Sequence, residues 1–454
     1  MKKTNDLGKD SIMSLVLKLA VPAMLAQLVN VLYTAVDRMF IGNIPDVGDI
    51  ALAGIGVCAP LAEFLASWGN LIGVGGSVYM AIKMGEGDNK KAERILSNSF
   101  QSLIVMSVVL TVIFLLAKEQ LIWWFGASGE TFGYANRYLT IYTCGAIFAI
   151  MAIGMNYFIS CQGFPAVSMA SVIIGAVTNI ILDYLFVFVM GWQVEGAAIA
   201  TVIAQFLSCT WTLVFLFGNR IHIKIKKHSI SPQILAKICK LGLSPFIMYS
   251  TNSVMVIILN VVLAMHGGEV MGDRLISAAT IVQSYALIIL NPLGGITAGT
   301  QAIISYNYGA GNYRRVIEAL NKITAVAVAF CAVMFVVSRF VPPYVAMLYT
   351  NEQEIIDLAV YGMKAYTIGL IPLALHYEAT DGLTALGMGG TALAMSAFRK
   401  ITFVILMFAI PAFLPPQNTF YFESVGDICC GLINTAACIL ILRRVFRAKG
   451  YRAR

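Results

Sequence analysis

The chain has 454 residues, of which 59% are hydrophobic and only 12% are charged, whereas soluble domains carry about 25% charged residues. This composition excludes a soluble globular domain and indicates a membrane protein that crosses the bilayer many times. The net charge of +8 does not indicate a nucleic-acid partner, because the basic residues lie in separate clusters between apolar stretches.

Twelve apolar stretches are long enough to cross a bilayer. In chain order they lie at about 12–42, 51–83, 95–117, 134–159, 165–190, 195–217, 241–265, 275–307, 317–340, 358–383, 391–414 and 421–446. The basic clusters, from Lys2 and Lys3 to the tail at Arg443–Arg454, all fall on one side of these spans, and acids such as Asp46 and Glu269 fall on the other. This positive-inside pattern predicts a multi-pass cell-membrane protein with both termini in the cytoplasm.

The first span contains a proline, Pro22, and an acid fifteen residues later, Asp37. A proline inside a helix removes one backbone hydrogen bond and favours a bend. A carboxyl group inside a bilayer is costly, at about 2.5–3.5 kcal/mol on insertion scales, and usually has a partner or a function. The combination predicts a helix that bends at Pro22 and holds a cation at Asp37.

An internal repeat with a spacing of 224 residues divides the chain in two. Gly85–Glu93 (GEGDNKKAE) matches Gly309–Glu318 (GAGNYRRVIE), and Gly75, Tyr142, Thr143, Gly145 and Gly163 match Gly299, Tyr366, Thr367, Gly369 and Gly387. Six spans per half is an even number, so the halves have the same orientation and are expected to be related by a pseudo-two-fold axis along the membrane normal. We expect a six-helix lobe at 1–217, a cytoplasmic linker at 218–240 and a second six-helix lobe at 241–454.

The two halves differ in their chemistry. The repeat places Asn260 where the first half has Asp37, and Met407 where it has Asp183. A cation-coupling site is therefore expected in the first half. Asn179 and Asp183 are four residues apart and share one helix face, as do Ala197 and Thr201 in the next span. With Asp37 they form a set of hard oxygen ligands that suits a proton or Na⁺. The alternative is a hydrogen-bonded structural pair of neutral acids.

The chain resembles the multidrug and toxic compound extrusion (MATE) family, and within it the MepA-type bacterial branch. The residues that carry the resemblance are KLAVPAMLAQLVNVLYTAVDRMFIGNI, GVGGSVYMAIKMGEGD and NIILDYLFVFVMGWQVEGAAIAT. The resemblance covers essentially the whole chain. It implies twelve helices in two lobes around a central cavity, and export of cationic amphiphilic compounds in exchange for H⁺ or Na⁺. It places the cation-coupling residues at Asp37, Asn179, Asp183, Ala197 and Thr201, and the bend at Pro22.

Other charges within the spans have two interpretations each. Glu63 could face the cavity and attract a cationic substrate, or it could lie near the outer interface or pair with a basic group. Glu378 and Asp381 could form a second cation or substrate site, or approach the cytoplasmic end and be solvated. Arg399 and Lys400 are expected to pair with Asp381 or Glu378, or to extend toward the headgroups.

The sequence favours a secondary antiporter that works as a monomer amid membrane lipids, with no cofactor beyond the coupling ion. An enzyme is not expected, because no HExxH, GxSxG or GxxxxGK[ST] motif occurs. The same absence of a nucleotide motif argues against ATP-driven transport. A flippase for a lipid-linked precursor is the alternative, and it predicts more basic residues in the cavity than the sequence suggests.

Overall fold

The computed structural model describes residues 5–45 and 47–449, with only the backbone described for Glu269 and Val270. The helices are α1 (Ile12–Gly42), α2 (Gly48–Gly85), α3 (Asn89–Trp124), α4 (Phe132–Cys161), α5 (Pro165–Asp183), the π-helix η1 (Tyr184–Val189), α6 (Gln193–Phe217), α7 (Pro232–Ser250), α8 (Asn252–Gly309), α9 (Tyr313–Phe340), α10 (Pro342–Ala346), α11 (Gln353–Tyr366), the 3₁₀ turn η2 (Thr367–Gly369), α12 (Leu370–Ala385), α13 (Gly389–Phe413), the 3₁₀ turn η3 (Pro416–Phe420) and α14 (Tyr421–Ala448). Within the described residues 12 helical segments are long and apolar enough to span a membrane. The predicted all-α fold with twelve spans is confirmed. Of the charges used to predict the orientation, Lys2, Lys3, Asp46, Arg452 and Arg454 lie outside the described residues, as does the side chain of Glu269.

Several spans differ from simple rods. The seventh runs from Pro232 to Gly268 and joins α7 to the first part of α8. Its helix therefore begins inside the segment predicted as a linker, because proline at a first helical position starts a helix well. Gly268, with a φ of 67°, makes the turn into the eighth span. The tenth span is built from α11, η2 and α12.

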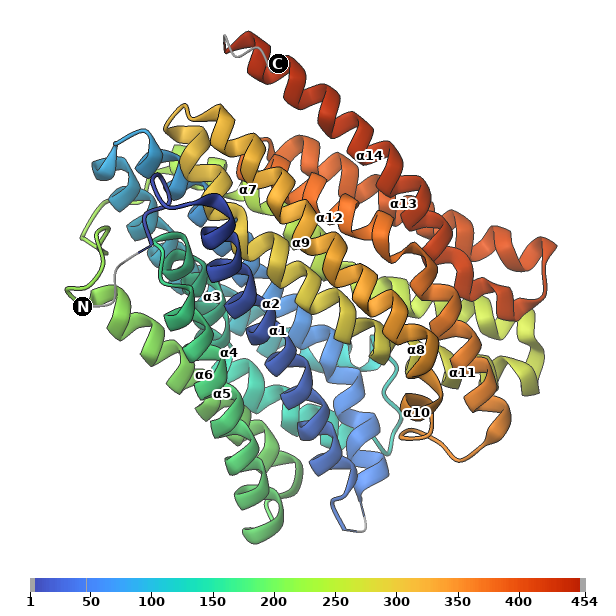
Figure 1. Cartoon of the computed structure of the whole chain (residues 1–454). Coiled ribbons are helices and arrows are strands. Elements are labelled where there is room, and N and C mark those ends of the chain that lie inside the picture. Colours follow the sequence, from blue (N-terminus) through green and yellow to red (C-terminus); the bar gives the residue numbers. More distant parts are fainter. Residues whose placement is uncertain (1–4, 46, 450–454) are drawn as a thin grey trace.

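The helices pack in two sets of six spans with the same internal arrangement (Figure 1). In the first lobe, made of α1–α6, α4 packs against α2, α3 and α6, and α5 packs against α1 and α6. In the second lobe, made of α7–α14, α12 packs against α8, α9 and α14, and α13 packs against α7 and α14. Each contact in one lobe thus has a counterpart between the equivalent spans of the other.

The lobes meet through α1 with α8 and α2 with α7, which are equivalent pairs, and through α2 with α8. From this contact region the two sets of helices diverge, so that the α5–α6 connection of the first lobe lies far from the second lobe (Figure 1). The lobes are therefore joined toward one end of the molecule and apart at the other.

The repeated Gly-x-Gly motif forms the crossing of α2 and α8. A Cβ atom on Gly85 would overlap the carbonyl oxygen of Tyr306, and a Cβ atom on Gly309 would overlap that of Ile82. Each glycine thus packs directly on the backbone of the other lobe, three residues before its own counterpart. The second glycines, Gly87 and Gly311, have φ values of 80° and 74° and end the helices in the left-handed region.

The segment before α1 ties the same end of the two lobes together. Arg315 of α9 donates from Nη2 to the carbonyl oxygens of Leu7 at 3.2 Å and Asp10 at 2.7 Å. Asn307 of α8 donates to the Leu7 carbonyl at 2.9 Å and accepts from Arg315 Nε at 3.0 Å. These bonds hold the N-terminal segment of the first lobe on the second.

A buried ion pair lies inside the second lobe, and it corrects the expectation for Arg399. Arg399 Nε is 2.6 Å from Oδ1 of Asp427 on α14, and both side chains are buried. Arg399 therefore neither extends toward the headgroups nor pairs with Asp381 or Glu378. Lys400 also has a different partner, since its Nζ donates to Asn252 Oδ1 at 2.8 Å. Asp427 is 28 residues from Arg399, on the next span, whereas Asn252 is 148 residues from Lys400.

Replacing Arg399 by methionine is expected to lower the free energy of unfolding by ~3–5 kcal/mol, because it leaves the Asp427 carboxylate buried without its counter-charge. Thermal unfolding of purified protein in detergent measures the loss. Arg137→Met is the matched control, since Arg137 and Glu195 are also 2.7 Å apart but partly exposed, and it should cost under ~1 kcal/mol. The double variant R399M/D427L should recover most of the loss. Equal stability of R399M and wild type would contradict the ion pair.

Replacing Gly85 by alanine is expected to destabilise the packing of α2 on α8 by ~1–3 kcal/mol, because the new methyl group meets the backbone of α8, which cannot move aside. Gly309→Ala should have a similar effect. Gly56→Ala, in the same helix α2 but with open space around its Cβ position, should leave the melting temperature unchanged or raise it. If all three variants melted alike, the direct backbone contact between the lobes would be wrong.

Candidate functional site

The predicted cation-coupling residues meet where α1, α5 and α6 pack together in the first lobe. Asp37 lies near the end of α1, and Asp183 is the last residue of α5. Their carboxyl groups lie within electrostatic range of each other across the helix interface. Asp183 and Asn179 are buried, and Asp37 is partly buried with Oδ1 fully covered. The structure therefore brings together acids that are 146 positions apart in the chain.

A chain of hydrogen bonds fixes the amide of Asn179. Its Nδ2 donates to Thr201 Oγ1 at 3.3 Å, and the Thr201 hydroxyl donates to the Ala197 carbonyl at 3.0 Å. The amide nitrogen is thus turned toward α6, which leaves Oδ1 on the other side of the group. Ala197 takes part through its carbonyl oxygen, which already accepts the Thr201 hydroxyl.

Four buried oxygen atoms remain at this site without a hydrogen-bond partner among the described residues: Asp37 Oδ1, Asn179 Oδ1, and Oδ1 and Oδ2 of Asp183. All four belong to groups that accept hydrogen bonds or bind hard cations. A buried acceptor with no donor is costly, by about 1–3 kcal/mol per group and more for a charged group. The arrangement can therefore bind a proton or a Na⁺ ion that satisfies several of these oxygens at once. We call this set the α1–α5 oxygen cluster.

The cluster has features that sequence patterns did not reveal. Asp183 is followed directly by the π-helix η1, and such wider turns are frequent at functional sites. Gly196 lets α6 approach the backbone of Phe186 in η1, with a Cβ position only 3.0 Å from its carbonyl carbon. Tyr138 of α4 interacts with Thr201 and lies within electrostatic range of Asp37. The one signal for Tyr138 in the sequence is a polar hydroxyl group on an otherwise buried helix face.

Within the described residues no three His, Cys, Asp or Glu side chains form a group able to hold a metal ion. Na⁺ at the α1–α5 oxygen cluster would therefore depend on amide, hydroxyl or carbonyl oxygens beside the two carboxyl groups. Asn179 Oδ1 fits this requirement, because it is buried, unpaired and four residues from Asp183.

Glu63 lies on α2 and faces the second lobe. Its side chain is exposed, yet it interacts with Ser253 of α8 and lies in electrostatic range of Arg38. Tyr249 of α7 is in electrostatic range of both Glu63 and Asp381. Glu63 therefore borders the space between the lobes.

Glu378 and Asp381 lie in electrostatic range of each other but in different surroundings. Asp381 interacts with Thr297 and Gln301 of α8. Glu378 is buried with its Oε1 atom unpaired among the described residues, and it lies near Cys438 of α14. Burial of Glu378 rules out the alternative that it is solvated at the end of the helix. Asp381 borders the space between the lobes, while Glu378 lies inside the second lobe.

An aromatic cluster joins the lobes beside Glu63. The Trp68 and Phe246 rings are 4.9 Å apart, and Phe64 is 6.1 Å from each of them. Phe64 and Trp68 belong to α2 and Phe246 to α7, so the cluster bridges the two lobes. Aromatic faces next to acids provide a surface that suits organic cations.

Comparison with known proteins gives relatives over nearly the whole chain. The chain is similar to the multidrug export protein MepA of Staphylococcus saprophyticus, with 25% identity over 426 residues and 93% of each protein covered. It is similar to the protein of the same name from Staphylococcus aureus strain MSSA476, with 26% identity over 428 residues and the same coverage. Among solved structures, MATE in complex with MaL6 superposes with a TM-score of 0.92 at 20% identity, covering 98% of this chain and 100% of that one.

An outward-facing MATE-family structure of the MOP superfamily also matches, with a TM-score of 0.91, 20% identity, and 98% and 100% coverage. These structural matches confirm the fold. A profile of the MatE family matches residues 22–185 and 247–411, which is most of the two lobes. The chain therefore belongs to the MatE family, the multidrug and toxic compound extrusion family that its sequence resembles.

Proposed function

We propose that this protein is a secondary multidrug exporter that moves cationic amphiphilic compounds out of the cell in exchange for H⁺ or Na⁺. The observation that carries the proposal is the α1–α5 oxygen cluster, whose buried acceptors have no donors among the described residues. A cation satisfies such a cluster, and a transporter uses this by binding the cation in one conformation better than in another. The printed name of the MepA relatives supports multidrug export.

Helix α1 links cation binding to the conformational change. Next to Pro22, α1 packs tightly on α8, because a Cβ atom on Gly295 would lie 2.8 Å from the Ala23 carbonyl oxygen. Beyond Pro22, α1 extends to Asp37 and packs on α5. Pro22 thus lies in the part of α1 that is attached to the second lobe, and Asp37 lies on the part beyond this contact. A bend there changes the position of Asp37 without breaking the contact between the lobes.

The space between the lobes provides the substrate site. Glu63 and Asp381 place acidic groups on opposite lobes, and the Phe64–Trp68–Phe246 cluster adds aromatic surface. An amphiphilic cation matches both features. Cation binding at the first lobe disfavours the substrate-bound outward state, which couples the two fluxes.

A flippase for a lipid-linked precursor is the second candidate. One observation favours it, namely the basic side chains Arg399 and Lys400 beside a cavity of the second lobe. Arg399 is neutralised by Asp427, however, and the acids between the lobes oppose a polyanionic headgroup. The multidrug exporter is the better hypothesis.

Further features complete the proposal. The protein works as a monomer amid membrane lipids, catalyses no reaction, and has no cofactor other than its coupling ion. Both termini are cytoplasmic, so the joined end of the lobes faces the cytoplasm and the separated end faces outward. The first lobe ends with α6 at Phe217 and the second begins with α7 at Pro232, with the connection between them on the cytoplasmic side.

Asp37→Asn is expected to lower gradient-driven dye transport about tenfold or more, because the cluster loses an ionisable oxygen ligand. Purified protein in liposomes is loaded with a cationic dye, and a pH gradient or a Na⁺ gradient is imposed separately. The gradient that drives the wild type identifies the coupling ion. Asp49→Asn is the control, since Asp49 is an exposed acid at the start of α2. Unchanged transport in D37N would place the coupling site elsewhere, with Glu378 and Asp381 next to test.

Pro22→Ala is expected to reduce transport roughly fivefold or more while leaving dye binding unchanged, because the helix regains a hydrogen bond and resists bending. Transport in liposomes and equilibrium dye binding in detergent separate the two effects. Pro60→Ala, inside α2, is the control for loss of a helix proline. A P22A variant that transports at the wild-type rate would remove the proline from the mechanism.

A further inference from the structure

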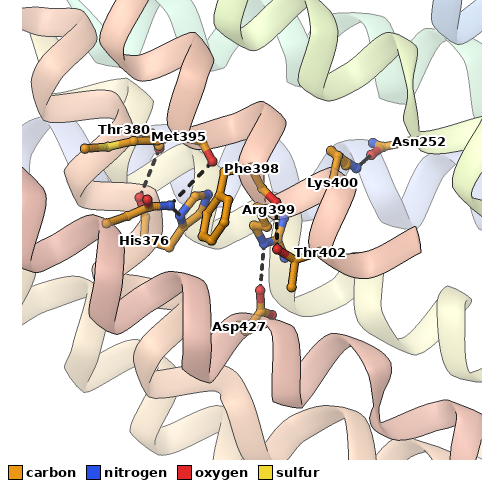
Figure 2. Close-up of polar contacts among 10 residues, drawn as sticks. Asn252, His376, Thr380, Met395, Phe398, Arg399, Lys400, Thr402 and Asp427 are labelled. Atoms are coloured by element: carbon orange, nitrogen blue, oxygen red, sulfur yellow. Dashed lines mark hydrogen bonds and ion pairs between the residues drawn. The ribbon is translucent and has the colours of Figure 1, made fainter. Parts of the chain in front are cut away.

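A small cavity lies inside the second lobe, away from the α1–α5 oxygen cluster. It has a volume of about 70 Å³ and lies among α7, α8, α12, α13 and α14. Its polar lining includes Tyr249, Asn252, Asn291, Lys400 and Glu423. Figure 2 shows Lys400 directed at Asn252 while Arg399 is directed at Asp427. The two neighbouring basic side chains therefore have different partners.

The charges around this cavity are not equivalent. Arg399 forms an ion pair with Asp427 at 2.6 Å, and its guanidinium group lies over the Phe403 ring. Lys400 donates to a neutral amide oxygen, and an ammonium group has three donors. Glu423 acts on Lys400 electrostatically, yet its buried Oε2 atom has no hydrogen-bond partner among the described residues. The cavity thus presents a lysine that is balanced by an acid but not bonded to it.

We propose that this cavity binds the carboxylate group of zwitterionic substrates, with Lys400 and Asn252 as its recognition residues. The proposal rests on the export function above and assigns a recognition site to it. Lys400 supplies a charge-assisted hydrogen bond to the carboxylate. Glu423 balances Lys400 when no carboxylate is present, so that the lysine is not an isolated buried charge.

The size of the cavity limits what can enter. A volume of about 70 Å³ accepts a charged end group but not a fused aromatic ring system. Tyr249 lines the cavity and lies in electrostatic range of Glu63 and Asp381. A cationic ring system would therefore remain between the lobes, next to those acids, while its carboxylate enters the second lobe.

The test uses two dyes that differ in one group: rhodamine 110, which has a free carboxylate, and rhodamine 123, its methyl ester. Binding to purified full-length protein in detergent is measured by fluorescence anisotropy, which does not depend on transport. Lys400→Gln is expected to weaken binding of the free acid about tenfold and to change ester binding by less than about twofold. Glu423→Gln should tighten binding of the free acid, because it removes a negative charge near the carboxylate, and leave the ester unchanged.

Lys118→Gln is the matched control. Lys118 also lies within a span and donates to a neutral oxygen, Thr140 Oγ1, at 2.8 Å, but it belongs to the first lobe. Both dyes should bind K118Q as they bind the wild type. Retained ester binding by K400Q shows that the variant is folded. If K400Q fails to fold, two other variants test the proposal: E423Q, and Lys400→Arg. Lys400→Arg keeps the positive charge and should keep binding of the free acid.

The proposal is overturned if the wild type does not bind the free acid, if K400Q weakens both dyes equally or neither, or if E423Q weakens the acid. The export function can fail independently. A protein that binds both dyes as expected, but moves neither under a pH or Na⁺ gradient, would retain this cavity as a carboxylate site and lose the antiport mechanism.

Discussion

The crossing of α2 and α8 is the contact on which the arrangement of the two lobes depends. At Gly85 and Gly309 the backbones touch without side chains between them, and each helix meets the other three residues before its own glycine. A contact of this kind fixes two long helices at one point and leaves the remainder of each free to diverge. The lobes are consequently joined at one end, where Arg315 and Asn307 also hold the N-terminal segment, and separated at the other.

The first lobe uses this geometry to hold an unsatisfied set of oxygens. The π-helix after Asp183 and the close approach of Gly196 bring α5 and α6 together behind the site. Thr201 takes the amide hydrogen of Asn179, so the acceptor side of that amide stays with the two acids. In a membrane interior such a cluster is stable only with a cation or proton that completes it. The coupling ion proposed for this site would supply the partner that these oxygens lack.

The second lobe has the same helix arrangement but resolves its buried charges differently. Met407, the counterpart of Asp183, is buried, and Asn260, the counterpart of Asp37, keeps an unpaired buried amide oxygen among the described residues. Instead, Arg399 on α13 and Asp427 on α14 of the second lobe form an ion pair and neutralise each other. Asp37 and Asp183 thus have no acidic counterparts in the second lobe, although Glu378 and Glu423 of that lobe also keep unpaired buried oxygens among the described residues.

The sequence alone determined the features that depend on local pattern. Hydrophobic length predicted the twelve spans, the spacing of 224 residues predicted equivalent lobes, and the separation of four residues placed Asn179 and Asp183 on one face. Asp37 and Asp183 were predicted to share a set of hard oxygen ligands, as the family resemblance also implies, and the structure brings the two carboxyl groups together. The start of α7 at Pro232 was missed, because Lys237 and Lys240 interrupt the apolar pattern of its first turns.

Only the tertiary structure decided the partners of buried groups. Arg399 had Glu378 and Asp381 in the preceding span as plausible partners, yet it pairs with Asp427 on α14. Lys400 bonds Asn252, and Tyr138 joins the cation site from α4. Helix faces and residue spacing follow from the period of the helix, which the sequence contains. Which faces of distant helices meet depends on how whole helices pack, and one-dimensional patterns do not encode it for an individual polar side chain.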